Sequence, residues 1–319
     1  MSSTRTALYS HGHSRLASRQ AMLFAFFLTF GFMIAELVGG VLANSLALIA
    51  DAGHMVSDAA ALGLGLAAMW MASHPHTERR TFGFHRAEIL AALANGALLL
   101  AIAFVVSWHA LARLREPQPV ASGPMLVIAL VGLVVNLAAI QVLGRHRHAN
   151  LNVRGAFLHV LGDALGSAGV IVAALVIRWT GFTPIDAIVS LFIAALIVFS
   201  GWRLVRETVS VLLESSPRHV DSEALRRDLV AIPGVVDVHD LHIWTVTSGF
   251  VSLSCHAEVF SADIADDVLR AATSLLRERY GIRHVTIQPE TSRVHEELEH
   301  CCLDDHEPRP SLRRFLSPS

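Results

Sequence analysis

The sequence has few charged residues, few cysteines and no lysine. Charged residues make up 16% of its 319 positions and hydrophobic residues 53%, which is more apolar material than one soluble core of this size requires. The formal net charge of −2 argues against a nucleic-acid binder, because neutralising several phosphates needs a basic surface. All 25 basic residues are arginine, and since arginine and lysine both act as topological signals, the missing lysine indicates no function. A membrane protein is therefore indicated.

The three cysteines, Cys255, Cys301 and Cys302, are too few for a disulfide framework in a chain of this length. They fit a reducing environment. The polar segment 1–20 precedes an apolar stretch that is about twice as long as the core of a signal peptide. We expect this stretch to stay in the protein as a first membrane span.

Apolar runs recur along the first two thirds of the chain, each near the roughly 20 residues that a membrane-spanning helix needs. They lie at 22–42, 46–71, 87–112, 125–143, 156–177 and 184–204. Arginines concentrate in the N-terminal arm, in the loops 73–86 and 144–155 and after the last run, whereas the opposite loops hold Arg113, Arg115 and Arg178. The positive-inside rule therefore places both termini in the cytoplasm.

The last third of the chain has the pattern of a small soluble domain. A helix capped by Asp221 or Ser222 is followed by two strands that turn at Ser248-Gly249, a second helix over 263–280 and a third strand. This order predicts a ferredoxin-like α/β fold. We therefore expect an α-helical membrane protein with six transmembrane helices and a C-terminal cytoplasmic ferredoxin-like α/β domain. The expected parts are a cytoplasmic arm (1–20), a six-span domain (21–208), a ferredoxin-like domain (209–290) and a flexible tail (291–319).

Ionisable residues occur inside two of the expected spans, although a charge at the centre of a span costs at least ~2.5 kcal/mol. The second span contains His54 and Asp58, and the fifth contains His159 and Asp163. In each pair the residues are four apart and so share one helix face. Two such faces supply the two imidazoles and two carboxylates of a tetrahedral Zn²⁺ site. Asp51 could accept a hydrogen bond from His54 and so orient its imidazole, or it could act as a proton site.

Two other interpretations of these pairs stay open. The polar side chains could be hydrogen-bonding contacts between helices, or they could form a proton relay without metal. Duplication of the His/Asp pair favours a metal site. Single polar residues in the spans are expected to form interhelical hydrogen bonds or to lie at the interface. These residues are Glu36, Asn95, His109, Asn136 and Asp186.

The two pairs do not fall at the same depth if the spans begin where the apolar runs begin. A rise of 1.5 Å per residue leaves a mismatch of several ångströms. We therefore expect the fifth span to be tilted or to begin earlier, near Asn150.

The chain resembles the cation diffusion facilitator family, and specifically its zinc-type metal/proton antiporters, from about residue 10 to about residue 290. The resemblance rests on four segments, at 48–58, 81–88, 159–163 and 238–244. It implies a lipid-embedded homodimer that exchanges Zn²⁺ for protons by alternating access, with Zn²⁺ as the transported ion and no cofactor. It also implies that His54, Asp58, His159 and Asp163 form the transport site. Histidine at position 54 favours Zn²⁺, with Cd²⁺ or Co²⁺ as alternatives, over Mn²⁺.

The resemblance also implies metal sites in the cytoplasmic domain. His239, His256 and Glu290 fall at matching positions, and His284 is a candidate partner. Strand alternation puts His256 and His284 on the solvent side of the sheet, where a histidine without a function is the alternative. The long histidine-rich loop of many eukaryotic members is absent, which favours a bacterial inner membrane. Further histidines and cysteines could gather metal or simply be solvated: His11, His13, His146, His148, Cys301 and Cys302.

A different class of function is a membrane metal sensor or scaffold with a structural intramembrane zinc. Ligand count does not separate it from a transporter, because a structural site also has four protein ligands. An enzyme is disfavoured, because a catalytic zinc keeps a position open for water and no separate nucleophile or general base accompanies these residues.

Overall fold

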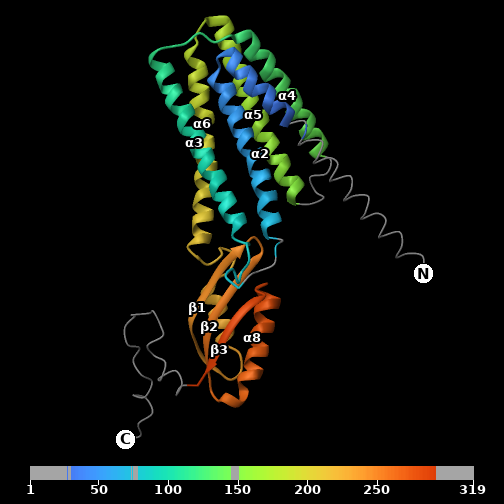
Figure 1. The fold of residues 1–319 in the computed structure, drawn as a ribbon, viewed down its shortest axis with the longest axis vertical. Helices are drawn as coiled ribbons and strands as arrows, with labels where there is room; N and C mark the ends of the chain where they lie inside the picture. The colour runs from blue at the N-terminus through green and yellow to red at the C-terminus, as the bar shows by residue number, and fades with distance from the viewer. Residues whose placement is uncertain (1–26, 28–29, 73, 75–77, 145–150, 292–319) are drawn as a thin grey trace, which may run out of the picture. The chain divides into compact units, whose positions relative to one another are not determined.

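The computed structural model describes residues 27, 30–72, 74, 78–144 and 151–291 (Figure 1). The chain divides into two compact units, Met1–Val209 and Ser210–Ser319. The first unit is a bundle of long helices, and the second is a small sheet with helices packed on it.

A helix lies within each of the six apolar runs, in the parts of these runs that the structure describes. Among the described residues, four helices are long and apolar enough to cross a membrane. They are Ala87–Arg115, Ser122–Val142, Val160–Thr180 and Pro184–Leu212. A shorter apolar helix covers Phe30–Ala43. The helices of the bundle are α2 (Leu46–Ala72), α3 (Ala87–Arg115), α4 (Ser122–Gly144), α5 (Leu151–Thr180) and α6 (Pro184–Leu212).

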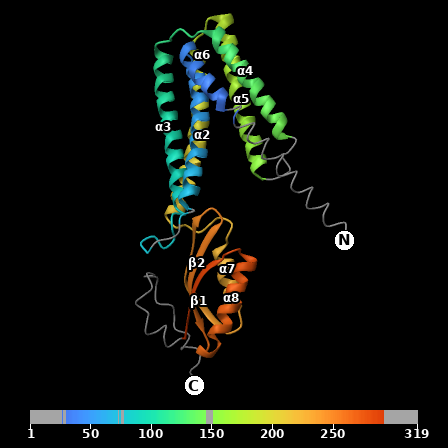
Figure 2. The ribbon, with the colours of Figure 1, turned by 45° about the vertical axis from the view of Figure 1, so that its right-hand side comes forward.

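Helix α5 begins at Leu151, next to the Asn150 start that the difference in depth between the two His/Asp pairs predicts. Helices α4 and α5 lie side by side, as do α2 and α3, and α2 also contacts α5 (Figures 1 and 2). Helices α3 and α6 meet at Gly96 and Gly201, where a Cβ added to either glycine would lie 3.4 Å from the carbonyl oxygen of the other. Small residues allow this close approach, which is typical of helix packing in membranes.

The second unit contains a three-stranded mixed sheet in the order β1-β2-β3 (Figure 1). Strand β1 (Val235–Thr247) pairs antiparallel with β2 (Phe250–Val259), which pairs parallel with β3 (His284–Glu290). Helix α7 (Ser222–Val230) precedes the sheet, and a 3-10 turn, η1 (Ala262–Ile264), leads into α8 (Ala265–Arg279). The predicted order of helices and strands is confirmed.

The local predictions for this unit are also confirmed. The Asp221 carboxylate caps α7 by accepting hydrogen bonds from the backbone N–H groups of Glu223 and Ala224. Gly249 has φ +74° at the turn between β1 and β2, and Gly281 has φ +69° after α8, a conformation that glycine adopts without steric cost.

The two faces of the sheet differ in character. Leu253 and Cys255 of β2 are buried in a core with Leu225 of α7 and Leu276 of α8. Successive side chains of a strand point to opposite faces, so His256 lies on the face away from this core. The polar face of the sheet is therefore available for a site.

Candidate metal sites

Helix α2 carries the first predicted pair on one face. His54 Nε2 lies 3.8 Å from Asp58 Oδ2, and both side chains are about one-third exposed or less. The spacing of four residues brings them together within a single helical turn. They are therefore two neighbouring side chains of the types that Zn²⁺ prefers as ligands.

Helix α5 meets this helix through Asp51 and Gly166. A Cβ added to Gly166 would lie 2.9 Å from Asp51 Oδ1, so the absence of a side chain lets the carboxylate sit against α5. Asp163 is buried one turn earlier on α5 and interacts electrostatically with Asp51. The structure thus brings Asp51 and Asp163 to the contact between α2 and α5.

The ligand atoms of the three described members of the predicted transport site do not form one tight cluster. Those of His54, Asp58 and Asp163 are not all within 4.8 Å of one another. His159 lies one helical turn before Asp163 on α5, and its side chain is outside the described residues. A shared ion would therefore require its ligands on α2 and α5 to approach each other.

Other polar residues in the bundle connect neighbouring helices as expected. Ser57 Oγ donates to Asn95 Oδ1 over 2.9 Å, and Asn136 Nδ2 donates to Ser167 Oγ over 3.4 Å. Glu36 is fully buried and interacts electrostatically with Asp51. His109 is exposed on α3. Ser57 lies between His54 and Asp58 on α2, and Ser167 lies four residues after Asp163 on α5, so each of these helices is tied to its neighbour close to the candidate site.

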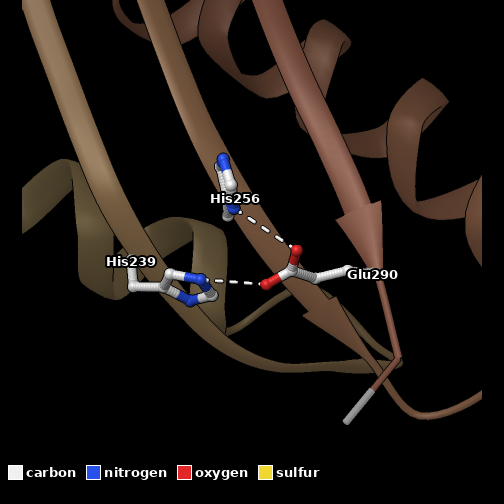
Figure 3. Close-up of side chains that lie close together, drawn as sticks. All are labelled: His239, His256 and Glu290. Atoms are coloured by element: carbon white, nitrogen blue, oxygen red, sulfur yellow. Dashed lines mark ion pairs between the residues drawn. The ribbon is translucent and has the colours of Figure 1, made fainter. Parts of the chain in front are cut away.

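A second candidate site lies on the polar face of the sheet in the second unit (Figure 3). Glu290 Oε1 lies 2.9 Å from His239 Nε2, and Glu290 Oε2 lies 3.3 Å from His256 Nδ1. The ligand atoms of the three residues lie within 4.8 Å of one another. Two imidazoles and a carboxylate are a common zinc ligand set that leaves a fourth position for another donor.

Strand pairing positions these three side chains. His239 on β1 is the register partner of His256 on β2, and Glu290 is the last residue of β3. The register of β1 shifts between His239 and His242, where Asp240 has φ +50°. This irregularity places Asp240 Oδ1 2.8 Å from His242 Nε2 and Asp240 Oδ2 3.8 Å from His256 Nε2.

Asp240 and His242 are residues of this site that sequence reasoning missed. Both lie within the family-like segment 238–244, but simple strand alternation does not predict the bulge. Because of it, each ring nitrogen of His256 faces a carboxylate, Glu290 on one side and Asp240 on the other. Carboxylates in such positions fix the orientation of a metal-bound imidazole.

His284 lies apart from this cluster. It begins β3, opposite Ser252, and its ring centroid is 5.7 Å from that of Phe250. It shares the face of His256, as strand alternation predicts, but at the other end of the strand from Glu290.

Cysteine does not contribute to the cluster in the described structure. Cys255 is buried on the opposite face, and burial raises the pKa of its thiol to about 12, with the charge of Asp240 adding to the effect. The remaining predicted metal-gathering residues lie outside the described residues: His11, His13, His146, His148, Cys301 and Cys302.

Two family models match the chain in succession. The cation efflux transmembrane domain matches residues 22–213, and the cytoplasmic domain of cation efflux proteins matches residues 217–292.

Curated relatives match over nearly the full length. A zinc transporter ZitB from Pectobacterium atrosepticum is 41% identical over 308 residues, which cover 94% of this chain and 96% of that protein. A cadmium, cobalt and zinc/H(+)-K(+) antiporter from Bacillus subtilis is 41% identical over 286 residues, 88% of this chain and 92% of that protein. A solved metal-bound C-terminal domain of the CzcD transporter from Cupriavidus metallidurans is 40% identical and covers 22% of this chain and 99% of its own, with a TM-score of 0.22. The chain is therefore an integral membrane protein that belongs to the cation efflux family, the cation diffusion facilitators.

Proposed function

We propose that this protein exports Zn²⁺ from the cytoplasm in exchange for protons, with Cd²⁺ and Co²⁺ as alternative substrates, and that it is a transporter and not an enzyme. The observation that carries this proposal is the contact between α2 and α5, where Asp51 sits against Gly166 and next to the buried Asp163. Carboxylates are placed in an apolar bundle at high cost unless a charged partner offsets it. The names of relatives that transport zinc or exchange cations for protons support the same function.

The proposed transport site consists of His54 and Asp58 from α2 and His159 and Asp163 from α5, with Asp51 behind them. Metal binding requires neutral imidazole and ionised carboxylate, so the same four groups bind either Zn²⁺ or protons. Histidine changes its charge near neutral pH, which lets a modest pH difference across the membrane bias the exchange. Cytoplasmic Zn²⁺ enters the deprotonated site, and protons from the outside displace it.

The proposed architecture is a homodimer in lipid. Each protomer has six membrane-spanning helices between 21 and 208, a ferredoxin-like domain over 209–290, and both termini in the cytoplasm. The boundary between the two compact units, at residues 209 and 210, supports this division. The helices within the six apolar runs support it too. The bacterial relatives support a bacterial inner membrane.

The cytoplasmic cluster is proposed as a second Zn²⁺ site that regulates transport. Glu290 is buried between two imidazoles, and the charge of a bound divalent ion offsets the cost of burying its carboxylate. The donor set of His239, His256 and Glu290 fits zinc better than a harder ion.

The test is Zn²⁺ flux into sealed proteoliposomes under an imposed pH gradient. Wild-type protein is compared with Asp163→Asn, which keeps the volume of the side chain and removes its charge. A matched control is Asp267→Asn on the exposed surface of α8. Gradient-dependent flux in the wild type and the control, and its loss in Asp163→Asn, supports the proposal. A wild type that binds Zn²⁺ without any flux supports a metal sensor or scaffold instead.

A further inference from the structure

Helix α2 begins against a side chain from another helix. Asp186, in the first turn of α6, is buried, and its Oδ1 accepts a hydrogen bond from Ser45 Oγ over 2.6 Å. The backbone N–H of Leu46 donates to Asp186 Oδ2 over 2.8 Å, and that of Ala47 donates to Asp186 Oδ1 over 3.3 Å. These residues are about 140 positions apart in the sequence.

The carboxylate completes the hydrogen bonding of the start of α2. The next two N–H groups, of Leu48 and Ile49, donate to the side-chain and backbone oxygens of Ser45, each over 3.3 Å. A helix start in an apolar bundle must satisfy these groups within the protein. The negative charge of Asp186 also lies at the positive end of the helix dipole. Asp186 is therefore a tertiary N-cap of α2.

Arg113 ties a third helix to the same point. Its Nη1 donates to the backbone oxygen of Asn44 over 2.6 Å and lies 3.7 Å from Asp186 Oδ2, while its Nη2 donates to Asn44 Oδ1 over 2.7 Å. Asn44 has φ +51° between the helix Phe30–Ala43 and α2, and its Nδ2 donates to Pro119 O over 2.9 Å. The guanidinium thus joins the end of α3 to the turn that introduces α2, at the end of the bundle where α6 begins (Figure 1).

The contacts of Asp186 and Arg113 hold the start of α2, and α2 carries half of the proposed transport site. His54 is eight residues after Leu46, or roughly 12 Å along the axis at 1.5 Å per residue. Two backbone groups held by two oxygens of one carboxylate restrain both the rotation and the axial position of α2. Rotation of α2 would turn the face that carries His54 and Asp58 away from α5.

We propose that Asp186 and Arg113 are positioning residues for metal transport, which hold α2 so that His54 and Asp58 face their partners on α5. This inference rests on the proposed transport function. Neither residue touches the transported ion. Removal of the cap is therefore expected to weaken the apparent affinity for Zn²⁺ and not merely to reduce the amount of folded protein.

The experiment measures the initial rate of Zn²⁺ uptake against Zn²⁺ concentration for purified full-length protein in proteoliposomes. The variants are Asp186→Ala, the isosteric Asp186→Asn, and Arg113→Gln. The control is Ser190→Ala on α6, since Ser190 Oγ donates to the backbone oxygen of Asp186 within the same helix. Rates are normalised to the folded protein recovered by gel filtration.

We expect KM for Zn²⁺ to rise roughly tenfold or more in Asp186→Ala, to rise less in Asp186→Asn and Arg113→Gln, and to stay within about twofold of the wild type in Ser190→Ala. If Asp186→Ala does not fold, Asp186→Asn and Arg113→Gln are judged by the same criterion. An unchanged KM in the folded variants overturns the inference, because the cap is then structural only. Absence of flux in the wild type overturns the proposed function itself, which is a different result.

Discussion

Oε1 of Glu290 lies 2.9 Å from Nε2 of His239 at the end of β3. The carboxylate is almost fully buried, and its second oxygen faces His256. A buried carboxylate is stable only with a compensating positive charge, which either a protonated imidazole or a bound divalent cation supplies. In the proposed Zn²⁺ site, the ion and protons would therefore compete for the same imidazole and carboxylate atoms.

The first prediction separates His256 from His284, which lie on the same face of the sheet. In full-length Asp163→Asn, where the transport site is disabled, His256→Ala should remove the remaining high-affinity Zn²⁺ site, because His256 belongs to the three-residue cluster. His284→Ala is the matched control and should leave this site intact. Isothermal titration with Zn²⁺ measures both. Equal loss in the two variants would contradict the assignment.

The second prediction concerns Asp240, whose carboxylate faces the ring nitrogen of His256 that points away from Glu290. Asp240→Asn should lower the affinity of the cytoplasmic site by roughly tenfold, within the range found when a partner of a metal-bound histidine is removed. The measurement is the same titration, with Asp263→Asn as a surface control. An affinity unchanged by Asp240→Asn would show that this carboxylate does not orient His256.

The third prediction is a pH dependence that originates at Cys255. Burial raises the pKa of its thiol from 9.0 to about 12, so the unfolded chain releases this proton at a lower pH than the folded chain. The contribution of the neutral thiol to stability is therefore complete below pH 9 and is lost as the pH rises from 9 towards 12. The melting temperature of the full-length protein should therefore fall less steeply between about pH 8 and about pH 10 in Cys255→Ala than in the wild type. Parallel curves would mean that the thiol titrates normally.

The fourth prediction tests the contact between α2 and α5. A methyl group at Gly166 would lie 2.9 Å from Asp51 Oδ1, whereas one at Gly169 on the same helix meets its nearest atom, on Val189, at 3.8 Å. Gly166→Ala should therefore reduce Zn²⁺ transport by roughly tenfold or more, since small displacements of binding groups have large effects on rate. Gly169→Ala should leave transport close to the wild-type rate. Similar rates for both variants would show that Asp51 does not need this close approach.

Local features of the cytoplasmic unit could be predicted from the sequence because short-range chemistry determines them. Asp221 caps α7 through neighbouring N–H groups, and Gly249 supplies the turn between adjacent strands. The face of His284 also follows from strand alternation, but its distance from His256 along the sheet depends on the register between β2 and β3. The bulge at Asp240 breaks the alternation itself and leaves no mark in a simple pattern of apolar and polar residues.

Long-range partners could not be predicted in the membrane unit. Asp186 was expected to form an interhelical hydrogen bond or to lie at the interface, and the hydrogen bond is confirmed, but the start of α2 as its partner depends on the packing of α6. The His/Asp pairs were visible because their spacing lies within one helix. The close approach of Asp51 to α5 depends on Gly166, whose role appears only when both helices are in place.

Exchange at the contact between α2 and α5 is tested by following Zn²⁺ and protons in the same vesicles. Full-length protein is reconstituted in vesicles that contain a Zn²⁺ indicator and a pH indicator, and Zn²⁺ is added outside without an imposed pH gradient. We expect Zn²⁺ entry to be accompanied by loss of protons from the lumen, and we expect Asp163→Asn to abolish both signals. Zn²⁺ entry without any proton movement, or both signals surviving Asp163→Asn, would contradict exchange at the contact between α2 and α5.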